Sequence, residues 1–230
     1  MKFKGEKVKK KLVLIGAGDF AEIAYEYFTF DSDYEVTGFC VEKKYLLKDE
    51  LAKLPVVPYE EIEEIYPPSL YEVFVAIPNS QLNRLRRRFY DDLKSKGYRF
   101  ATYVSSHAFV WRNVEIGENT FIFENNVIQP FVKVGVNCIV WSGNHIGHGS
   151  VIGDHVFLAS HAVVSGFCKI NDSCFIGVNS TIVDNVEVGR DCVIGAGAII
   201  TKDTDIGKIY PGIASEPAKV SSLRYYKIRD

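Results

Sequence analysis

The 230-residue chain is predicted to hold two units, an α/β domain followed by a parallel β-helix of six-residue repeats. Three observations support this fold class. An aliphatic residue recurs at every sixth position through the second half, a strand–glycine–helix pattern stands near the start, and the pattern changes near residue 101. A fixed short period is typical of a solenoid, in which each repeat packs against its neighbours.

The six-residue period is the strongest pattern in the sequence. An α-helix has 3.6 residues per turn and a strand has a period of two, so neither explains an obligatory aliphatic residue at every sixth position. Three repeats make one triangular coil of 18 residues, and about six stacked coils are therefore expected. The repeated positions are Val104, Val110, Ile116, Ile122, Ile128, Val134, Val140, Ile146, Ile152, Leu158, Val164, Ile170, Ile176, Ile182, Val188, Ile194, Ile200 and Ile206.

The remaining positions of the repeat predict corners and core. Glycine follows the aliphatic residue in eight repeats, and Asn and Asp are frequent elsewhere; all three tolerate positive φ, so we expect them at corners. Known hexapeptide folds coil left-handed, an exception to the right-handed crossover rule, so a left-handed β-helix is expected. Four of the five cysteines share one otherwise small position and are predicted to fill the core rather than form disulfides or bind metal: Cys138, Cys168, Cys174 and Cys192.

The first half alternates strands and helices. An apolar segment at 11–15 is followed by a glycine turn and a helical stretch to residue 30. Further strands are expected at 34–41 and 73–77, and a basic helix at 81–96. This alternation predicts a small, doubly wound, Rossmann-like domain. The expected boundaries are 1–100 for this domain, 101–212 for the β-helix, and 213–230 for a C-terminal loop and tail.

Composition limits the partners and the compartment. A hydrophobic fraction of 47% and a charged fraction of 24% are those of an ordinary globular protein. The net charge of −2, without a basic block, gives no reason to expect nucleic acid. No apolar run reaches the roughly 18 residues that cross a bilayer, and the apolar segment after the basic residues 1–11 is too short for a signal peptide. We therefore expect a cytoplasmic protein with no membrane partner.

The histidines are the candidate catalytic groups, and all five are predicted to face outward from the coils. Because residues 18 apart stack, His148 should lie beside Gly166, where an imidazole could act as a general base and a backbone N–H could stabilise an oxyanion. The alternative is that the histidines lie at surface turns. Zinc needs a third ligand beside His145 and His148, and none is evident, so no metal is expected. The other three are His107, His155 and His161.

The glycine turn of the first half is a candidate phosphate site. Gly16 and Gly18 follow a strand and open a helix, where backbone N–H groups can hold a phosphate. The domain is small for a dinucleotide, so a mononucleotide or nucleotide-diphosphate sugar fits better. The alternatives are a turn that only packs helix on strand, and a solvated face for the arginines at 84–88. The candidate substrate-binding residues are Gly16, Gly18, Asp19, Phe20, Glu42 for a ribose hydroxyl, Pro78, Asn79 and Arg84 for a phosphate.

Residues 146–154 and 165–166 resemble the I-x-H-x-x-x-I-G-D…G segment of bacterial nucleotide-sugar acetyltransferases of the sialic-acid O-acetyltransferase group, within the hexapeptide-repeat superfamily. The resemblance implies His148 as the catalytic base and the Gly166 amide as the group that holds the thioester carbonyl of acetyl-CoA. Residues 194–197 resemble a glycine-rich acetyl-CoA contact in which Ala196 faces the cofactor. Residues 217–219 resemble a terminal signature, with Lys219 near the coenzyme A end. Ser165 and Phe157 complete the expected cofactor contacts.

Two departures from the family bear on the proton relay. Some members have an acidic residue after the catalytic histidine, where this chain has Gly149. A later family histidine corresponds to Phe157. The group that orients His148 should therefore come from elsewhere, such as Asn144, a neighbouring subunit or water, while His145 is the second candidate base.

The resemblance implies a homotrimer with an active site between two β-helices. The expected reaction is acetyl-CoA-dependent N-acetylation of a nucleotide-linked amino-deoxy sugar in bacterial surface-glycan (lipopolysaccharide, O-antigen) biosynthesis. Proximity of two bound substrates would supply much of the catalysis. The alternatives are O-acetylation of sialic acid or a related sugar, a non-catalytic nucleotide-binding scaffold, and a zinc-dependent hydratase.

Overall fold

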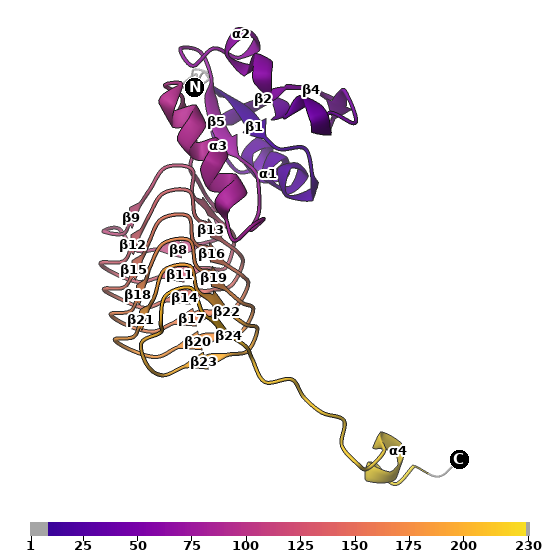
Figure 1. Ribbon diagram of the computed structural model, residues 1–230, viewed down its shortest axis with the longest axis vertical. Coiled ribbons are helices and arrows are strands. Elements are labelled where there is room, and N and C mark those ends of the chain that lie inside the picture. The colour runs from indigo at the N-terminus through magenta and orange to yellow at the C-terminus, as the bar shows by residue number, and fades with distance from the viewer. Residues whose placement is uncertain (1–8, 229–230) are drawn as a thin grey trace, which may run out of the picture.

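The computed structural model describes residues 9–228, so most of the basic N-terminal stretch and the last two residues lie outside the description. An α/β domain sits at one end of a parallel β-helix, and the C-terminal segment extends away from the other end (Figure 1). The β6 strand of the α/β sheet ends at Phe100, and the first β-helix strand begins at Tyr103.

The α/β domain is a mixed six-stranded sheet with the order β3-β4-β2-β1-β5-β6. All pairs are parallel except β3 with β4. Apolar residues of α1 cover one face of the sheet, while α2 and α3 cover the other. The elements are β1 (Lys10–Ile15), α1 (Asp19–Phe30), β2 (Tyr34–Val41), the 3₁₀ turns Lys43–Tyr45 and Tyr59–Glu61, β3 (Glu50–Leu51), β4 (Leu54–Pro58), α2 (Ile62–Ile65), β5 (Glu72–Val75), α3 (Arg84–Ser95) and β6 (Arg99–Phe100).

The α3 helix is shorter than the sequence pattern indicates. Residues Gln81, Leu82 and Asn83 have φ between +50° and +65°, so a left-handed turn precedes the helix. The buried Asn83 amide donates to the carbonyl oxygens of Ser173 and Cys174 in the β-helix. This turn therefore ties the loop after β5 to the coils.

The β-helix is a three-sided prism of two-residue strands, whose parallel sheets are consistent with the expected left-handed coil. The first face contains β7 (Tyr103–Val104), β10 (Phe121–Ile122), β13 (Ile139–Val140), β16 (Phe157–Leu158), β19 (Phe175–Ile176), β22 (Val193–Ile194) and β24 (Ile209–Tyr210). The second face contains β8 (Phe109–Val110), β11 (Val127–Ile128), β14 (His145–Ile146), β17 (Val163–Val164), β20 (Thr181–Ile182) and β23 (Ile199–Ile200). The third face contains β9 (Glu115–Ile116), β12 (Lys133–Val134), β15 (Val151–Ile152), β18 (Lys169–Ile170) and β21 (Glu187–Val188).

The aliphatic series fills the interior, and the buried thiols of the repeat lie among it, as expected for core residues. Strands of successive coils pair with an 18-residue offset, for example Val127 with His145. The last member of the series is an exception: Ile206 is 60% exposed and lies in no strand. Val193 pairs with Ile209, sixteen residues on, because the final coil is two residues short.

The corners differ from the expectation in one respect. Positive φ occurs at the third position after the aliphatic residue, in fourteen consecutive repeats from Asn119 to Gly197. The glycines directly after the aliphatic residue, Gly207 excepted, do not have positive φ. They are small because the coils approach closely: a Cβ on Gly117 would lie 2.6 Å from the backbone of Gly135. The expectation that these glycines provide left-handed corners was therefore wrong, whereas Asn and Asp do occupy such corners.

The C-terminal segment is extended up to a single helical turn, α4 (Ser222–Tyr225), where a loop was expected. Among residues 9–228, no helix is both long enough and apolar enough to span a bilayer.

The two units share one aromatic core. Phe20 and Phe28 of α1 contact Phe121 of the first face, with ring centroids 5.9 and 5.6 Å apart. Phe20 also lies 6.0 Å from Trp141 and is 5% exposed. The expectation that Phe20 binds substrate is corrected by this position, because its ring fills the contact between the units.

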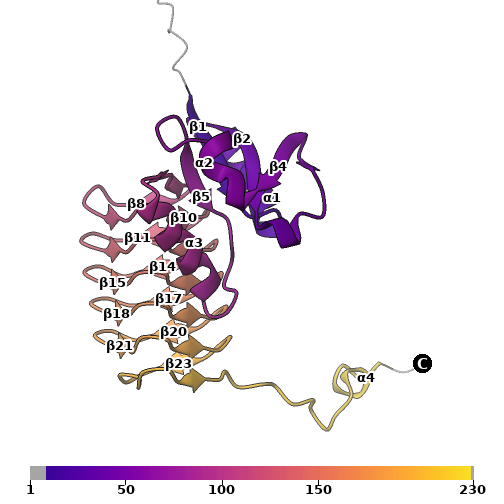
Figure 2. The same ribbon diagram turned by 45° about the horizontal axis from the view of Figure 1, so that its top comes forward.

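The α3 helix lies along the coils and forms the second contact between the units (Figure 2). Arg86 is completely buried, and its guanidinium donates to the carbonyl oxygens of Pro78, Asn137 and His155 at 2.5, 3.1 and 3.1 Å. The arginines of this helix are therefore not a uniform solvated face: Arg84, Arg87 and Arg88 are exposed, but Arg86 anchors the helix to the coils.

His155 lies beneath this helix and is only 7% exposed, contrary to the expectation that it faces outward. Its ring lies 5.8 Å from that of Tyr90. The repeat phase places His155 outside the coil, as expected, but α3 covers that part of the surface.

Candidate functional site

His148 lies at the exposed corner between the second and third faces, two residues after β14. The side-chain oxygen of Gln129, from the preceding coil, lies 3.0 Å from the His148 backbone nitrogen and 3.2 Å from Nδ1. The ring packs edge-on against Phe167 of the next coil, with centroids 4.8 Å apart. Neighbours from three successive coils thus hold an imidazole at the protein surface.

Gly166 lies beside this imidazole, as the 18-residue stacking predicts. A Cβ on Gly166 would lie 2.9 Å from Cε1 and 3.2 Å from Nε2 of His148, so the absence of a side chain makes room for the ring. The Gly166 N–H, however, donates to Asp184 Oδ1 at 2.8 Å. The expected free donor for a thioester oxygen is therefore engaged in this structure. The neighbouring Ser165 carbonyl accepts from the Ser150 hydroxyl.

The other expected members of this site do not gather around His148 within one chain. Asn144 is buried, and its amide accepts from Ala162 N–H and donates to the Trp141 carbonyl, so it braces the coil instead of orienting His148. His145 projects from the second face, between Val127 and Val163.

Phe157 lies on the first face, 7% exposed and stacked on Phe175 at 5.4 Å. This position is a correction to the expectation that it contacts the cofactor beside His148. Ala196 is exposed at the corner between the first and second faces, and Lys219 is exposed on the C-terminal segment.

The second candidate region lies at the carboxyl ends of β1, β2 and β5, which meet at one edge of the α/β sheet. Gly16 has φ +127°, and a Cβ there would lie 2.7 Å from the Ala76 carbonyl oxygen, so its role is structural. Gly18 caps α1, and a Cβ there would meet no atom within 4 Å. Asp19 is exposed beside it, so the start of α1 is open to a ligand.

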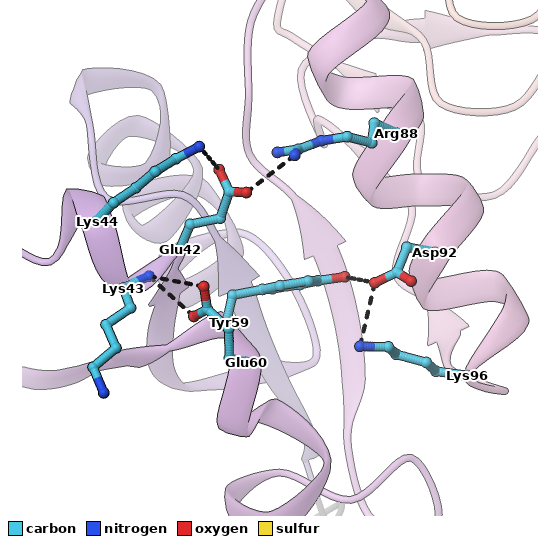
Figure 3. Close-up of polar contacts among 8 residues, drawn as sticks. All are labelled: Glu42, Lys43, Lys44, Tyr59, Glu60, Arg88, Asp92 and Lys96. Carbon is cyan, nitrogen blue, oxygen red and sulfur yellow. Dashed lines mark hydrogen bonds and ion pairs between the residues drawn. The ribbon is translucent and has the colours of Figure 1, made fainter.

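Glu42 follows β2 at this edge, and Figure 3 shows its carboxylate between Lys44 and Arg88. Arg88 Nη1 lies 3.0 Å away, and the hydrogen bond from this guanidinium lowers the pKa of the Glu42 carboxyl, although partial burial opposes it. The carboxylate of Glu42, which was expected to bind a ribose hydroxyl, is therefore already paired with two cationic side chains. Arg88 was not singled out from the sequence, although it belongs to the basic run.

The structure places the remaining expected residues of this region near the coils. The Pro78 carbonyl accepts from Arg86, and the Asn79 carbonyl accepts from Asn83 N–H. Arg84 pairs with Asp191 of the β-helix at 2.5 Å, so it serves the contact between the units instead of an open phosphate site.

The 18-residue stacking also places Asp184 next in line after Gly166, but sequence reasoning missed Gln129 and Phe167 around His148. Both follow from the stacking period when it is applied with a tolerance of one residue, since they lie 19 residues before and 19 residues after His148. Within residues 9–228, no group of three His, Cys, Asp or Glu residues is placed to hold a metal ion. Burial raises the pKa of the Cys138 thiol to about 12, which suits a core residue.

Comparison with known proteins supports the fold class. Residues 167–202 match the family described as "Bacterial transferase hexapeptide (six repeats)", so the six-residue period over these residues is that of the hexapeptide repeat. A search of curated proteins gave no match to the chain.

Several solved structures share the architecture of both units. Perosamine N-acetyltransferase from Caulobacter crescentus, solved as a histidine-to-asparagine variant in complex with CoA and GDP-perosamine, is 20% identical with a TM-score of 0.78, over 86% of this chain and 90% of that one. The acetyltransferase domain of PglB from Neisseria gonorrhoeae is 24% identical with a TM-score of 0.79, over 87% and 96%. WeeI from Acinetobacter baumannii is 22% identical with a TM-score of 0.71, over 87% and 96%. At these identities the likeness shows the fold.

Proposed function

We propose that the protein is an acetyl-CoA-dependent N-acetyltransferase that acts on a nucleotide-linked amino-deoxy sugar in bacterial surface-glycan biosynthesis. The observation that carries the proposal is the exposed imidazole of His148, which Gln129 holds through Nδ1 while its Nε2 lies beside the glycine at position 166. The shared architecture with two acetyltransferase structures, one of them a perosamine N-acetyltransferase with CoA and GDP-perosamine, supports the class of substrates.

His148 would act as the general base. As the sugar amine forms a bond to the thioester carbonyl carbon, Nε2 accepts a proton from the amine nitrogen. The carbon–sulfur bond then breaks, and the leaving sulfur takes that proton from Nε2 and departs as the coenzyme A thiol. A thioester reacts readily with an amine once both are positioned, so no covalent enzyme intermediate is required. Gly166 and Ser165 would line the approach, with Gly166 making room for the ring. Because Asp184 occupies the Gly166 N–H, that amide can serve the oxyanion only after this carboxylate moves.

The nucleotide diphosphate would bind at the open start of α1. The sheet order places β1 between β2 and β5, so the strands that follow β1 in sequence lie first on one side of it and then on the other. At such a reversal of strand order, a crevice is expected outside the carboxyl end of β1. Backbone N–H groups near Gly18 and Asp19 suit a phosphate. Asn79 lies on the loop after β5, and Glu42 with Arg88 closes the side toward β2. The site therefore offers both phosphate and hydroxyl recognition.

A homotrimer would complete the site, because His148 and Ala196 lie at different corners of one β-helix. The second face is the natural contact, since four of its six outward side chains are apolar and exposed, whereas the third face carries ion pairs such as Lys133–Glu115 and Lys169–Glu187. The apolar residues are Phe109, Val127, Val163 and Ile199.

A charge placed on the second face tests this assembly. Val163→Lys is expected to shift the mass measured by light scattering from three times 25.9 kDa toward a single chain. Val151→Lys on the third face is the matched control, because the two valines are 37% and 38% exposed. A Val163→Lys variant that remains trimeric would place the interface elsewhere.

The reaction is tested by thiol release from acetyl-CoA with UDP-, dTDP- and GDP-linked amino sugars. Turnover with one sugar, lowered about 100-fold or more in His148→Ala with an unchanged fold, is the expected result. His161→Ala, which removes another exposed histidine, is the control. An unchanged kcat in His148→Ala would make His145 the next candidate. Acetyl-CoA binding without turnover would indicate a hydroxyl acceptor such as sialic acid, and no binding would favour a scaffold.

A further inference from the structure

We infer that Gln129 is a positioning residue that fixes the tautomer of His148, with the proton on Nδ1 and an open lone pair on Nε2. The inference rests on the proposed function only in that Nε2 serves as the general base; the tautomer itself follows from the hydrogen bonds. Gln129 is then the group that orients His148, since the next residue in the chain, Gly149, has no side chain to do so.

The identity of the amide atom near His148 follows from the backbone. A backbone N–H is an obligatory donor, so the Gln129 atom that lies 3.0 Å from His148 N must be the carbonyl oxygen and not the amide nitrogen. The same oxygen lies 3.2 Å from Nδ1. An oxygen of this kind only accepts, so Nδ1 must donate. A neutral imidazole has one N–H, which leaves Nε2 unprotonated.

The rest of the corner keeps the ring in this orientation. Phe167 packs edge-on against it at 4.8 Å, and Gly166 lies close to the Cε1 and Nε2 edge. The acceptor nitrogen therefore faces the glycine of the next coil, where the proposed reaction needs it, while Gln129 holds the opposite edge.

The same contacts explain why no acidic residue follows the histidine. Gly149 has φ +69°, and a Cβ there would lie 2.7 Å from the Phe167 ring. A side chain at 149 and a phenyl ring at 167 compete for one space. Gln129 reaches Nδ1 of His148 from the previous coil and does not enter the space that the Phe167 ring occupies.

The test is ¹⁵N NMR of histidine-labelled protein without substrates, with the His148 signals assigned by their loss in His148→Ala. The wild type is expected to show the Nδ1–H tautomer. Gln129→Met, which keeps length but removes the acceptor, should give a mixture of tautomers and lower kcat about 10-fold or more with KM little changed. Gln129→Glu, which retains an acceptor, should restore the Nδ1–H form.

Asn113→Met is the control for the corner itself, because Asn113 accepts from Phe131 N–H in the same way, and the residue that it bonds is a phenylalanine and not a histidine. It should change neither the tautomer nor kcat. If Gln129→Met does not fold, Gln129→Asn shortens the side chain and serves the same purpose. An unchanged tautomer in the folded variant overturns the inference, whatever the activity. A changed tautomer in a protein without any turnover supports the hydrogen bond and refutes the transferase instead.

Discussion

The wild-type protein is expected to lose stability at mildly acidic pH because of His155, and replacement of His155 by Asn is expected to remove that loss. His155 ends a buried ladder of stacked side chains, in which Val75 N–H donates to Asn119, Asn119 to Asn137, and Asn137 Nδ2 to His155 Nδ1, at 2.8, 2.7 and 2.8 Å. Since Nδ1 accepts here, protonation of the imidazole would break the last bond. The folded structure therefore holds His155 neutral.

The size of the effect follows from proton linkage. Burial lowers the pKa of His155 from 6.5, and Arg87 adds to this, while Asp154 opposes it. Above pH 6.5 the histidine is mainly neutral in both states and the full stability is present. As the pH falls below 6.5, the unfolded chain takes up the proton first. Stability is then lost by up to about 1.4 kcal/mol per pH unit and per chain, until the folded protein is protonated too.

The assay is urea unfolding of the wild type and His155→Asn between pH 7.5 and 5. Asn suits φ +60° at this corner, as it does at Asn137, so the variant should fold. Its midpoint should fall less on acidification than that of the wild type. His161→Asn is the control, because His161 is exposed and has φ +59°. Parallel pH dependence of wild type and His155→Asn would refute the reasoning.

Two further pairs of variants test the contact between the units and the nucleotide site. Arg86→Met leaves several buried carbonyl oxygens without a donor and should lower the free energy of unfolding by about 3 kcal/mol or more. Arg87→Met removes an exposed ion pair with Asp91 and should lower it by under about 0.5 kcal/mol. Equal losses of stability in the two variants, measured by denaturation, would show that Arg86 does not anchor the helix. Gly16→Ala should destabilise the fold because of its φ and the close Ala76 carbonyl, whereas Gly18→Ala should leave stability unchanged and weaken binding of a nucleotide-diphosphate sugar by calorimetry. Unchanged binding in Gly18→Ala would move the phosphate away from α1.

The six-residue period made the β-helix predictable because every repeat packs its aliphatic residue into the same interior. An aliphatic residue must point inward in every repeat, so the sequence records the coil directly. The period could not reveal where left-handed φ falls. His155, Phe167 and Asp191 all adopt it at equivalent positions, and the coil geometry imposes that conformation whichever side chain is present. Nor could it reveal the short final coil, where Ile206 keeps the sequence phase but leaves the core.

The contact between the two units was not predictable from either pattern. Repeat phase shows whether a residue points into the coil, but it does not show what covers the outside. His155 and Phe157 were therefore assigned to the surface or to a cofactor, although α3 and the aromatic core cover them. In the same way, Arg86 and Phe20 belong to helices whose partner surface lies more than 50 residues away in sequence.

The neighbourhood of His148 shows how a solenoid can move an orienting group along the chain. Two positions reach the same imidazole, the next residue and the residue 19 earlier, because coils stack at a spacing of 18. Here the ring of Phe167 blocks the first position, and Gln129 occupies the second. Gly149→Glu should therefore destabilise the corner when Phe167 is present, and Gly149→Glu with Phe167→Ala should relieve the clash. If the double variant also restores kcat to a Gln129→Met background, the two positions are interchangeable routes to one tautomer; if it does not, a carboxylate at position 149 cannot replace the Gln129 amide.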